Sequence, residues 1–271
     1  MARTNIFRDH KQRVLAEKSA ASGVALAAAS PNARQADGLG GIVPLNTGDN
    51  AAALMLVKLT SDRARLREIQ SVERKVEAKR EMLEDYQAWL DGLIEGAENL
   101  PLDVRNDVLT TCMIWHIDTG GFARALHLGA VAVDRSIPMP SWFERTTACA
   151  LAENLAKAAF DALRDKSEFD VDHITSAMLI TDEKDMHDEV RAKLFKAQAM
   201  LLDRNADALF ALGGAAADAP AGAYAATLDG ALAAATRALQ LHGECGVKSL
   251  IQKLERAIKK SQAEVAQAKS T

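Results

Sequence analysis

The chain has 271 residues and a formal net charge of −4, with 48% hydrophobic but only 4% aromatic residues. Residues that favour helices dominate, and no run of alternating β-branched and polar residues indicates a strand, so we expect an all-α protein. The odd number and wide spacing of Cys112, Cys149 and Cys245 argue against a disulfide framework or a zinc site. No apolar run is long enough to span a membrane, so no membrane partner is expected.

Charge is distributed unevenly along the chain. Residues 1–80 hold 14 Lys and Arg against 8 Asp and Glu, whereas residues 81–247 hold 13 against 27. Residues 248–271 are basic again, with 6 against 2. This pattern indicates that the ends meet a polyanion, or that copies of the chain contact one another through opposite charges.

Residues 1–50 are predicted to form a flexible basic arm and linker. The first 20 residues have the pattern of a short amphipathic helix, and the Ala-, Gly-, Ser- and Pro-rich stretch that follows is typical of a linker. This arm is a candidate DNA contact, and a solvated tail is the alternative. Its cations are Arg3, Arg8, Lys11, Arg13 and Lys18.

Residues 51–100 are predicted to form a basic helical hairpin for DNA binding or oligomerisation. Apolar residues recur there at spacings of three, four and seven, which is helical periodicity. Thr60, Ser61 and Asp62 are residue types that cap helices, so we expect helices over 51–60 and 62–95 to meet at a turn.

The same segment carries the main candidate for a DNA contact. Arg63, Arg67 and Arg74 fall along one helical stripe at spacings of four and seven, which can neutralise phosphates and release their counterions. Interspersed glutamates make a solvated helix face the alternative interpretation. The candidate residues are Lys58, Arg63, Arg65, Arg67, Arg74, Lys75, Lys79 and Arg80. The basic C-terminal tail from residue 248 admits the same two interpretations.

Residues 101–271 are predicted to form a helical-hairpin domain with a basic tail. The expected helices cover residues 101–117, 121–136, 141–165, 170–180, 186–204, 221–241 and 244–268. Small residues among leucines make the C-terminal half similar to the αα-hairpins of tetratricopeptide repeats, although the full repeat signature is missing.

Two clusters in this domain have residue types that occur in catalytic or metal sites. The acids Asp182, Glu183, Asp185, Asp188 and Glu189 would suit paired metal ions, but they lie at an expected helix start, where acids stabilise the helix dipole. Cys112, His116 and His127 are better explained as core or surface residues than as metal ligands. No nucleotide-binding or metalloprotease motif occurs. We therefore assign no catalytic residue, no metal ligand and no cofactor.

Residues 107–140 carry a more specific pattern. A helix ends in a tryptophan, an Asp-Thr-Gly turn follows two residues later, and an alanine–leucine helix leads to a methionine–proline turn. This arrangement resembles the small terminase subunits of peduovirus-type temperate tailed phages. The matching residues are Trp115, Asp118, Thr119, Gly120, Ala125, Leu126, Met139 and Pro140. Blocks at 54–69 with 79–83, 185–202 and 235–256 agree in the same order, so the resemblance covers about residues 54–260.

The resemblance implies a protein of viral genome packaging and capsid assembly in the host bacterial cytoplasm. It implies recognition of the cohesive-end site on concatemeric double-stranded DNA, recruitment of the large ATPase–nuclease subunit, and a ring-shaped homo-oligomer. That family is traditionally labelled the endonuclease subunit, yet no nuclease motif supports catalysis by this chain. The alternatives are an αα-repeat interaction module without DNA binding, and an endonuclease subunit that depends on Mg²⁺.

Overall fold

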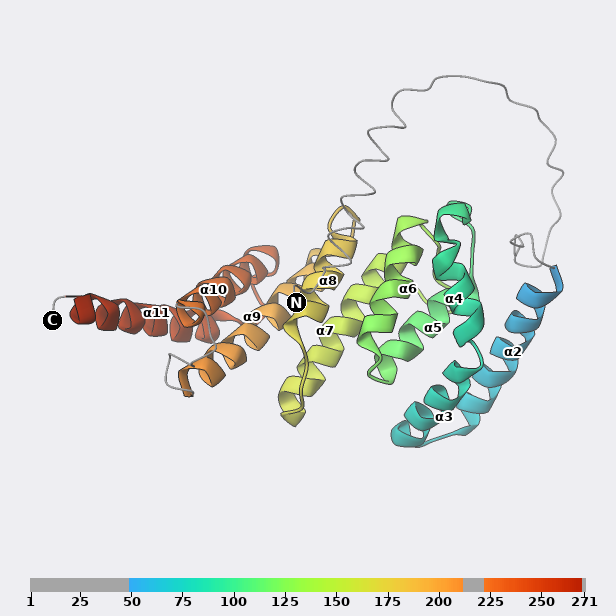
Figure 1. Ribbon diagram of the computed structural model, residues 1–271, viewed down its shortest axis with the longest axis horizontal. Coiled ribbons are helices and arrows are strands. Elements are labelled where there is room, and N and C mark those ends of the chain that lie inside the picture. The colour runs from blue at the N-terminus through green and yellow to red at the C-terminus, as the bar shows by residue number, and fades with distance from the viewer. Residues whose placement is uncertain (1–48, 212–221, 270–271) are drawn as a thin grey trace, which may run out of the picture. The chain divides into compact units, whose positions relative to one another are not determined.

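The computed structural model describes residues 49–211 and 222–269, with side chains described over 51–211 and 222–263. These ranges contain helices and no strand (Figure 1), which confirms the all-α prediction. The helices are α2 (Asp49–Glu68), α3 (Val72–Glu84), α4 (Gln87–Glu95), the 3-10 helix η1 (Ala97–Asn99), α5 (Asp107–Asp118), α6 (Phe122–Asp134), α7 (Thr147–Asp165), α8 (Val171–Thr181), α9 (Asp188–Ala211), α10 (Ala223–Leu241) and α11 (Lys248–Lys269). The predicted arm, with Arg8, Lys11 and Arg13, lies outside the described residues.

Helix α5 is the buried centre of the part that carries the family pattern. Every residue from Val108 to Ile117 is buried, because α2, α3, α6 and α7 all pack against this helix. The predicted helix start at Pro101 is wrong. The side chain of Asn106 caps α5 by accepting the Leu109 N–H at 3.1 Å, and Asp103 has a positive φ of 58° that ends any helix before it.

Helix α2 is longer than the sequence predicts. The expected turn at Thr60 is wrong, because the Thr60 hydroxyl donates to the Leu56 carbonyl at 2.9 Å within a continuous helix. The break comes later, where Ser71 adopts an extended conformation and its hydroxyl accepts the Arg74 N–H at 3.4 Å. Asp62 is therefore no cap, and its carboxylate is directed into the core instead.

Small residues let the remaining helices approach closely. The buried alanines of α10 pack against α9 in a core that Val247 and Leu254 extend toward α11. Between α6 and α7, Gly129 lies so close to Leu151 that an added Cβ would come within 2.8 Å of a leucine methyl. Helix α9 runs to Ala211, beyond the predicted residue 204, and α7 begins at the Thr146 cap, not at residue 141.

The structure tests the predicted helices but not the predicted division into domains. The boundaries at residues 50 and 100, and the similarity to tetratricopeptide hairpins, stay predictions. Across the second boundary α3 packs on α5. Within the described ranges, no helix combines the length and the apolar character needed to cross a bilayer.

Candidate nucleic-acid interface

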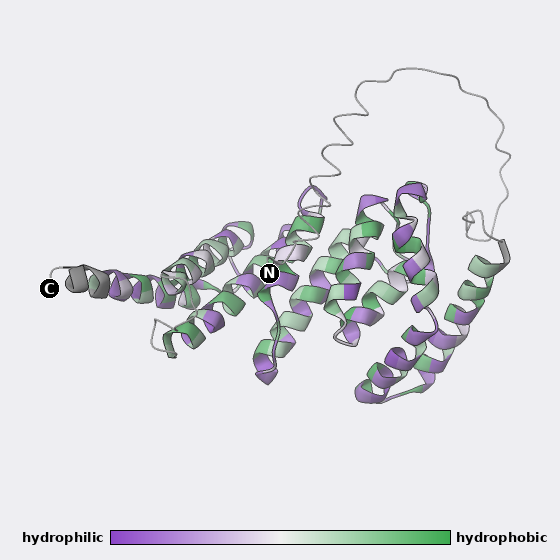
Figure 2. Cartoon of the chain, in the orientation of Figure 1, coloured by the Kyte–Doolittle hydropathy of each residue, from purple (hydrophilic) through white to green (hydrophobic). Residues whose placement is uncertain are grey.

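Unpaired cations gather around the connection between α2 and α3. Arg67 ends α2 on an exposed surface, and exposed Arg74 and half-buried Lys75 open α3. Across the described side chains, none of these three forms an ion pair. Figure 2 shows α3 as a predominantly hydrophilic helix. Positive groups that lack an internal partner are the ones able to neutralise phosphates.

The predicted single stripe of Arg63, Arg67 and Arg74 is wrong as one continuous helical face. Arg63 and Arg67 share a face of α2 at a spacing of four, but the chain bends at residues 69–71 before Arg74. The two helices then run antiparallel, since Arg65 of α2 lies opposite Glu81 of α3. The structure replaces the stripe with cations on both sides of a bend.

Arg65 has only a weak internal partner. Its Nη2 lies 3.8 Å from the Glu81 carboxylate, and both side chains are more than half exposed. An exposed ion pair at this distance contributes little, because water screens the charges. Arg65 is therefore compatible with a DNA contact from the exposed surface of α2.

Lys58 has a structural role in the core of the helix pair. Its Nζ lies 3.0 Å from Asp62 and 2.8 Å from Asp85, and 5.1 Å from the centre of the Tyr86 ring. These contacts raise the pKa of Lys58 against the opposing effect of burial. Lys58 balances the buried carboxylate of Asp62, so the interface is better sought among the other cations.

Lys79 and Arg80 attach α3 to the end of α5. Lys79 Nζ lies 2.6 Å from the Asp118 carboxylate, and Arg80 Nη2 donates to the Thr119 carbonyl at 3.5 Å. Asp118 ends α5 and Thr119 caps it, which confirms that this turn ends a helix. The Asp-Thr-Gly turn of the sequence pattern thus positions the basic helix, a role that the sequence did not indicate.

The acidic cluster lies only in part at a helix start, where the sequence placed all of it. Asp182 is the C-cap residue of α8, while Asp188 and Glu189 lie in the first turn of α9. Glu189 pairs with Lys193 one turn later at 3.2 Å. Across the described residues no group of three or more His, Cys, Asp or Glu side chains could hold a metal ion.

The histidine and cysteine candidates belong to the core around α5. His116 is buried, and burial together with the charge of Arg124 lowers its pKa to about 4. Burial raises the pKa of the Cys112 thiol, so this cysteine stays protonated at neutral pH. The same two causes that act on His116, burial first, lower the pKa of half-buried His127.

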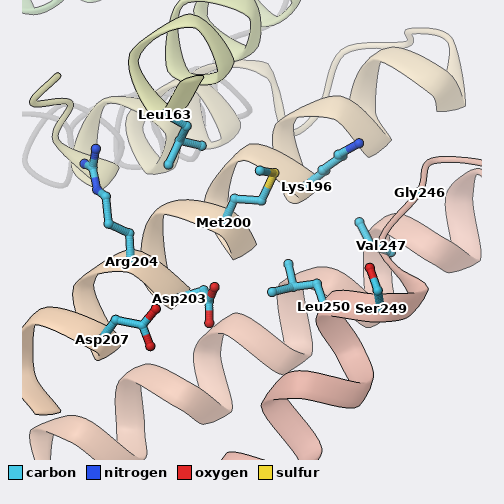
Figure 3. Close-up of a pocket in the computed structure, with 10 residues that line it drawn as sticks. All are labelled: Leu163, Lys196, Met200, Asp203, Arg204, Asp207, Gly246, Val247, Ser249 and Leu250. Atoms are coloured by element: carbon cyan, nitrogen blue, oxygen red, sulfur yellow. The ribbon is translucent and has the colours of Figure 1, made fainter. Parts of the chain in front are cut away.

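A pocket of about 440 Å³ lies among α7, α9 and α11 (Figure 3). Two cations line it, but each already donates to backbone carbonyls. Lys196 donates to Cys245 at 2.7 Å, and Arg204 donates to Ser167 and Phe169 at 2.9 and 2.8 Å. These bonds fasten neighbouring segments to α9, and the two acids of the lining, Asp203 and Asp207, pair with Lys253 of α11, so the pocket's charges are explained without a ligand.

Comparison with known proteins identifies the family of this chain. The family model described as phage small terminase subunit matches residues 56–189, from α2 into α9. The chain is also 35% identical over 205 residues to the "Terminase, endonuclease subunit" of Escherichia phage P2, which covers 76% of this chain and 73% of that protein. The chain belongs to the phage small terminase subunit family. No solved structure matches it.

Membership gives this small terminase subunit a role in packaging phage DNA together with the large terminase subunit. The matched range contains α2 from residue 56, all of α3 and the turn that holds α3. Sequence reasoning missed Arg105 and Trp142. Trp142 contacts Arg63 in the second half of α2, and Arg105 bonds to Ser141 beside Trp142. A tryptophan two residues after the methionine–proline turn was the signal that the sequence offered.

Proposed function

We propose that this small terminase subunit recognises the cohesive-end site of concatemeric phage DNA in the host cytoplasm and recruits the large subunit to it. The observation that carries the proposal is the group of cations at the α2–α3 bend, Arg67, Arg74 and Lys75, which lack ion-pair partners among the described residues. Arg63 and Arg65 extend this group along α2.

A ring of several copies explains how an acidic chain holds DNA. One copy offers a handful of phosphate contacts, which supports only modest affinity at physiological salt. Copies that bind one DNA together act at high effective concentration, so weak contacts add up to firm binding. Leu54 and Val57, exposed on the first half of α2, support a contact between copies.

Light scattering on the purified full chain tests the oligomer. We expect a multimer for the natural chain and a smaller species for a Leu54→Asp, Val57→Asp variant. Leu179→Asp on α8, another exposed leucine, is the matched control and should leave the mass unchanged. A natural chain that is monomeric at all concentrations contradicts the ring.

A binding experiment tests the recognition. The purified chain is titrated onto a labelled duplex that spans the joined genome ends, and onto a duplex of equal length and scrambled sequence. We expect tighter binding to the joined ends, and weaker binding to both as salt rises. If binding is absent or insensitive to salt, the proposal fails, and the alternative of a protein-interaction module without DNA contact is favoured.

The name of the P2 relative supports a second candidate, an endonuclease subunit that works within the terminase. Incubation of the purified chain with Mg²⁺ or Mn²⁺ and the joined-end duplex separates the two candidates. Nicked DNA would assign cutting to this chain, and intact DNA would assign it to the large subunit or to the assembled enzyme.

A further inference from the structure

Trp142 carries the guanidinium of Arg63 on the face of its indole ring. The Cζ atom of Arg63 lies 3.3 Å from the ring centre, which is a stacking distance, and Trp142 keeps 40% of its surface exposed. The two residues come from α2 and from the connection between α6 and α7. A guanidinium stacked on an indole is fixed in its plane, while its N–H donors stay directed outward along that plane.

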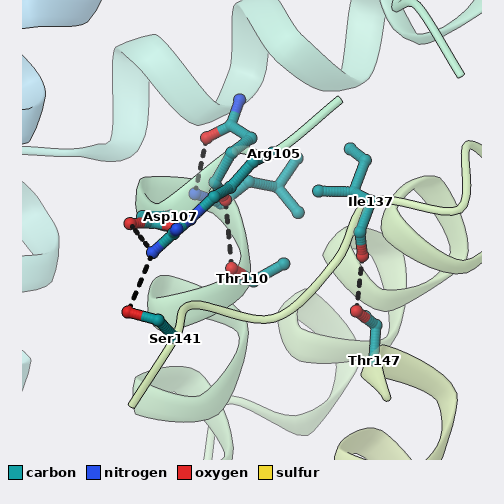
Figure 4. Close-up of polar contacts among 8 residues, drawn as sticks. Arg105, Asp107, Thr110, Ile137, Ser141 and Thr147 are labelled. Atoms are coloured by element: carbon teal, nitrogen blue, oxygen red, sulfur yellow. Dashed lines mark hydrogen bonds and ion pairs between the residues drawn. The ribbon is translucent and has the colours of Figure 1, made fainter. Parts of the chain in front are cut away.

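Two hydrogen bonds hold the part of the connection that precedes Trp142 (Figure 4). Before it, Arg105 Nη2 donates to the Ser141 hydroxyl at 3.4 Å. Nearer α7, the Thr147 hydroxyl donates to the Ile137 carbonyl. These bonds tie the connection to Arg105, just before α5, and to Thr147 at the start of α7, so the segment that leads to the indole is held in place.

The local balance of charge leaves Arg63 available to an anion. The charge of Asp107 acts on Arg63, but Arg105 already holds that carboxylate through two hydrogen bonds, at 2.6 and 2.9 Å. Arg67, one turn along α2, adds a second positive charge beside Arg63. Glu144 is the acid of the connection, and its neighbour Arg145 lies 3.7 Å from Glu153 of α7. In the described part of the chain, Arg63 and Arg67 form no ion pair.

We propose that Arg63 and Arg67 form a preoriented clamp for a backbone phosphate of double-stranded DNA, and that Trp142 is the positioning residue of this clamp. The inference rests on the proposed recognition of DNA and adds to it a contact that runs from Arg67, at the α2–α3 bend, to Arg63 one turn earlier on α2. A planar donor fork matches the geometry of a phosphate, and its fixed orientation reduces the entropy cost of binding.

The test compares the affinity of full-length variants for the joined-end duplex at several salt concentrations. Trp142→Ala and Arg63→Ala should each weaken binding by about tenfold, and the double variant should bind no more weakly than Arg63→Ala alone. Arg63→Lys keeps the charge but removes the planar fork, so it should also weaken binding severalfold. Trp142→Phe keeps an aromatic face and should bind nearly as well as the natural chain.

The controls separate the possible failures. Leu179→Ala on α8 removes another exposed apolar side chain and should leave the affinity unchanged. Melting temperature and oligomer mass are measured for every variant, so that a folding defect is not mistaken for weaker DNA binding. If the natural chain binds the duplex and Trp142→Ala binds as tightly, the clamp is wrong and the proposed function stands. A Trp142→Ala variant that binds DNA normally but no longer oligomerises overturns the clamp in favour of a protein contact. If the natural chain does not bind the duplex, the proposed function fails as well.

Discussion

The hydroxyl of Tyr86 donates a 2.7 Å hydrogen bond to the carboxylate of Asp62 and joins α2 to the link between α3 and α4. Tyr86 is fully buried, and Lys58 supplies the opposite charge at 3.0 Å from Asp62. This buried pair fixes the helix that carries Arg63, Arg65 and Arg67. The position of the candidate DNA surface therefore depends on a contact that involves no DNA-binding residue.

Tyr86→Phe should destabilise the fold, because it removes one partner of a buried carboxylate and leaves the ring contact with Trp115 in place. We expect a loss of about 1.5–3 kcal/mol in the free energy of unfolding, measured by urea denaturation. Tyr224→Phe on α10 is the control, and its cost should be smaller because Tyr224 is only half-buried. Equal effects of the two variants would contradict the role given to Asp62.

Gly129→Ala should destabilise the contact between α6 and α7. The new methyl group would come within 2.8 Å of Leu151, which is itself fully buried. Such overpacking costs about 1–3 kcal/mol, which exceeds the gain of at most about 1 kcal/mol from the better helix former.

Gly92→Ala on α4 is the matched substitution for Gly129→Ala. A Cβ at Gly92 meets no atom within 4 Å, so this variant should stabilise the protein by about 0.5–1 kcal/mol. Chemical denaturation of both variants provides the comparison. If both substitutions changed the free energy of unfolding in the same direction, the close contact between Gly129 and Leu151 would not be what determines the effect at Gly129.

His116 should make the fold sensitive to mild acid. Its pKa is about 4 in the folded chain against 6.5 when unfolded, so the unfolded chain binds the extra proton between these values. The contribution is present above pH 6.5 and declines as the pH falls toward 4, by at most about 3 kcal/mol.

His116→Leu isolates this contribution. Burial also lowers the pKa values of His127 and His173, so the natural chain becomes less stable in acid for several reasons. Urea denaturation at a series of pH values should give a shallower dependence for His116→Leu than for the natural chain. Parallel curves would mean that His116 is solvated in the folded state.

Asn106→Ala should loosen the start of α5, since the Asn106 side chain caps the Leu109 N–H. We expect a cost of about 1 kcal/mol in the free energy of unfolding. Asn106→Asp keeps an acceptor at the cap and should restore most of the stability. An Asn106→Ala variant as stable as the natural chain would show that this cap does not stabilise the start of α5.

The sequence was sufficient for features that depend on local patterns. Helical periodicity identified every described helix from α5 onward, although several helix ends were misplaced, and the Asp118 turn was correctly taken as a helix end. Errors arose where a distant partner overrides a local preference. Asp62 has the residue type of a cap, but Tyr86, far along the chain, takes its carboxylate into the core.

The candidate site shows the same limit more clearly. Composition identified the cations of α2 and α3, but not which of them have internal partners. Lys58 and Lys79 are paired with Asp85 and Asp118, whereas Arg67 keeps an exposed position without such a partner among the described residues. The stacking of Arg63 on Trp142 joins segments that no helical periodicity relates.

The central claim is that the cations at the α2–α3 bend bind DNA phosphates. Its most direct test compares the salt dependence of binding to the joined-end duplex for the natural chain and for a variant with Arg67→Ala, Arg74→Ala and Lys75→Ala. A control variant with Lys157→Ala, Arg164→Ala and Arg237→Ala removes the same charge from α7 and α10.

We predict weaker binding for the bend variant, and a plot of log affinity against log salt that is shallower by about 0.9 for each phosphate that the variant no longer neutralises. The control variant should keep the slope of the natural chain. Equal affinities and slopes for the natural chain and the bend variant would contradict the account and move the DNA contact away from this bend.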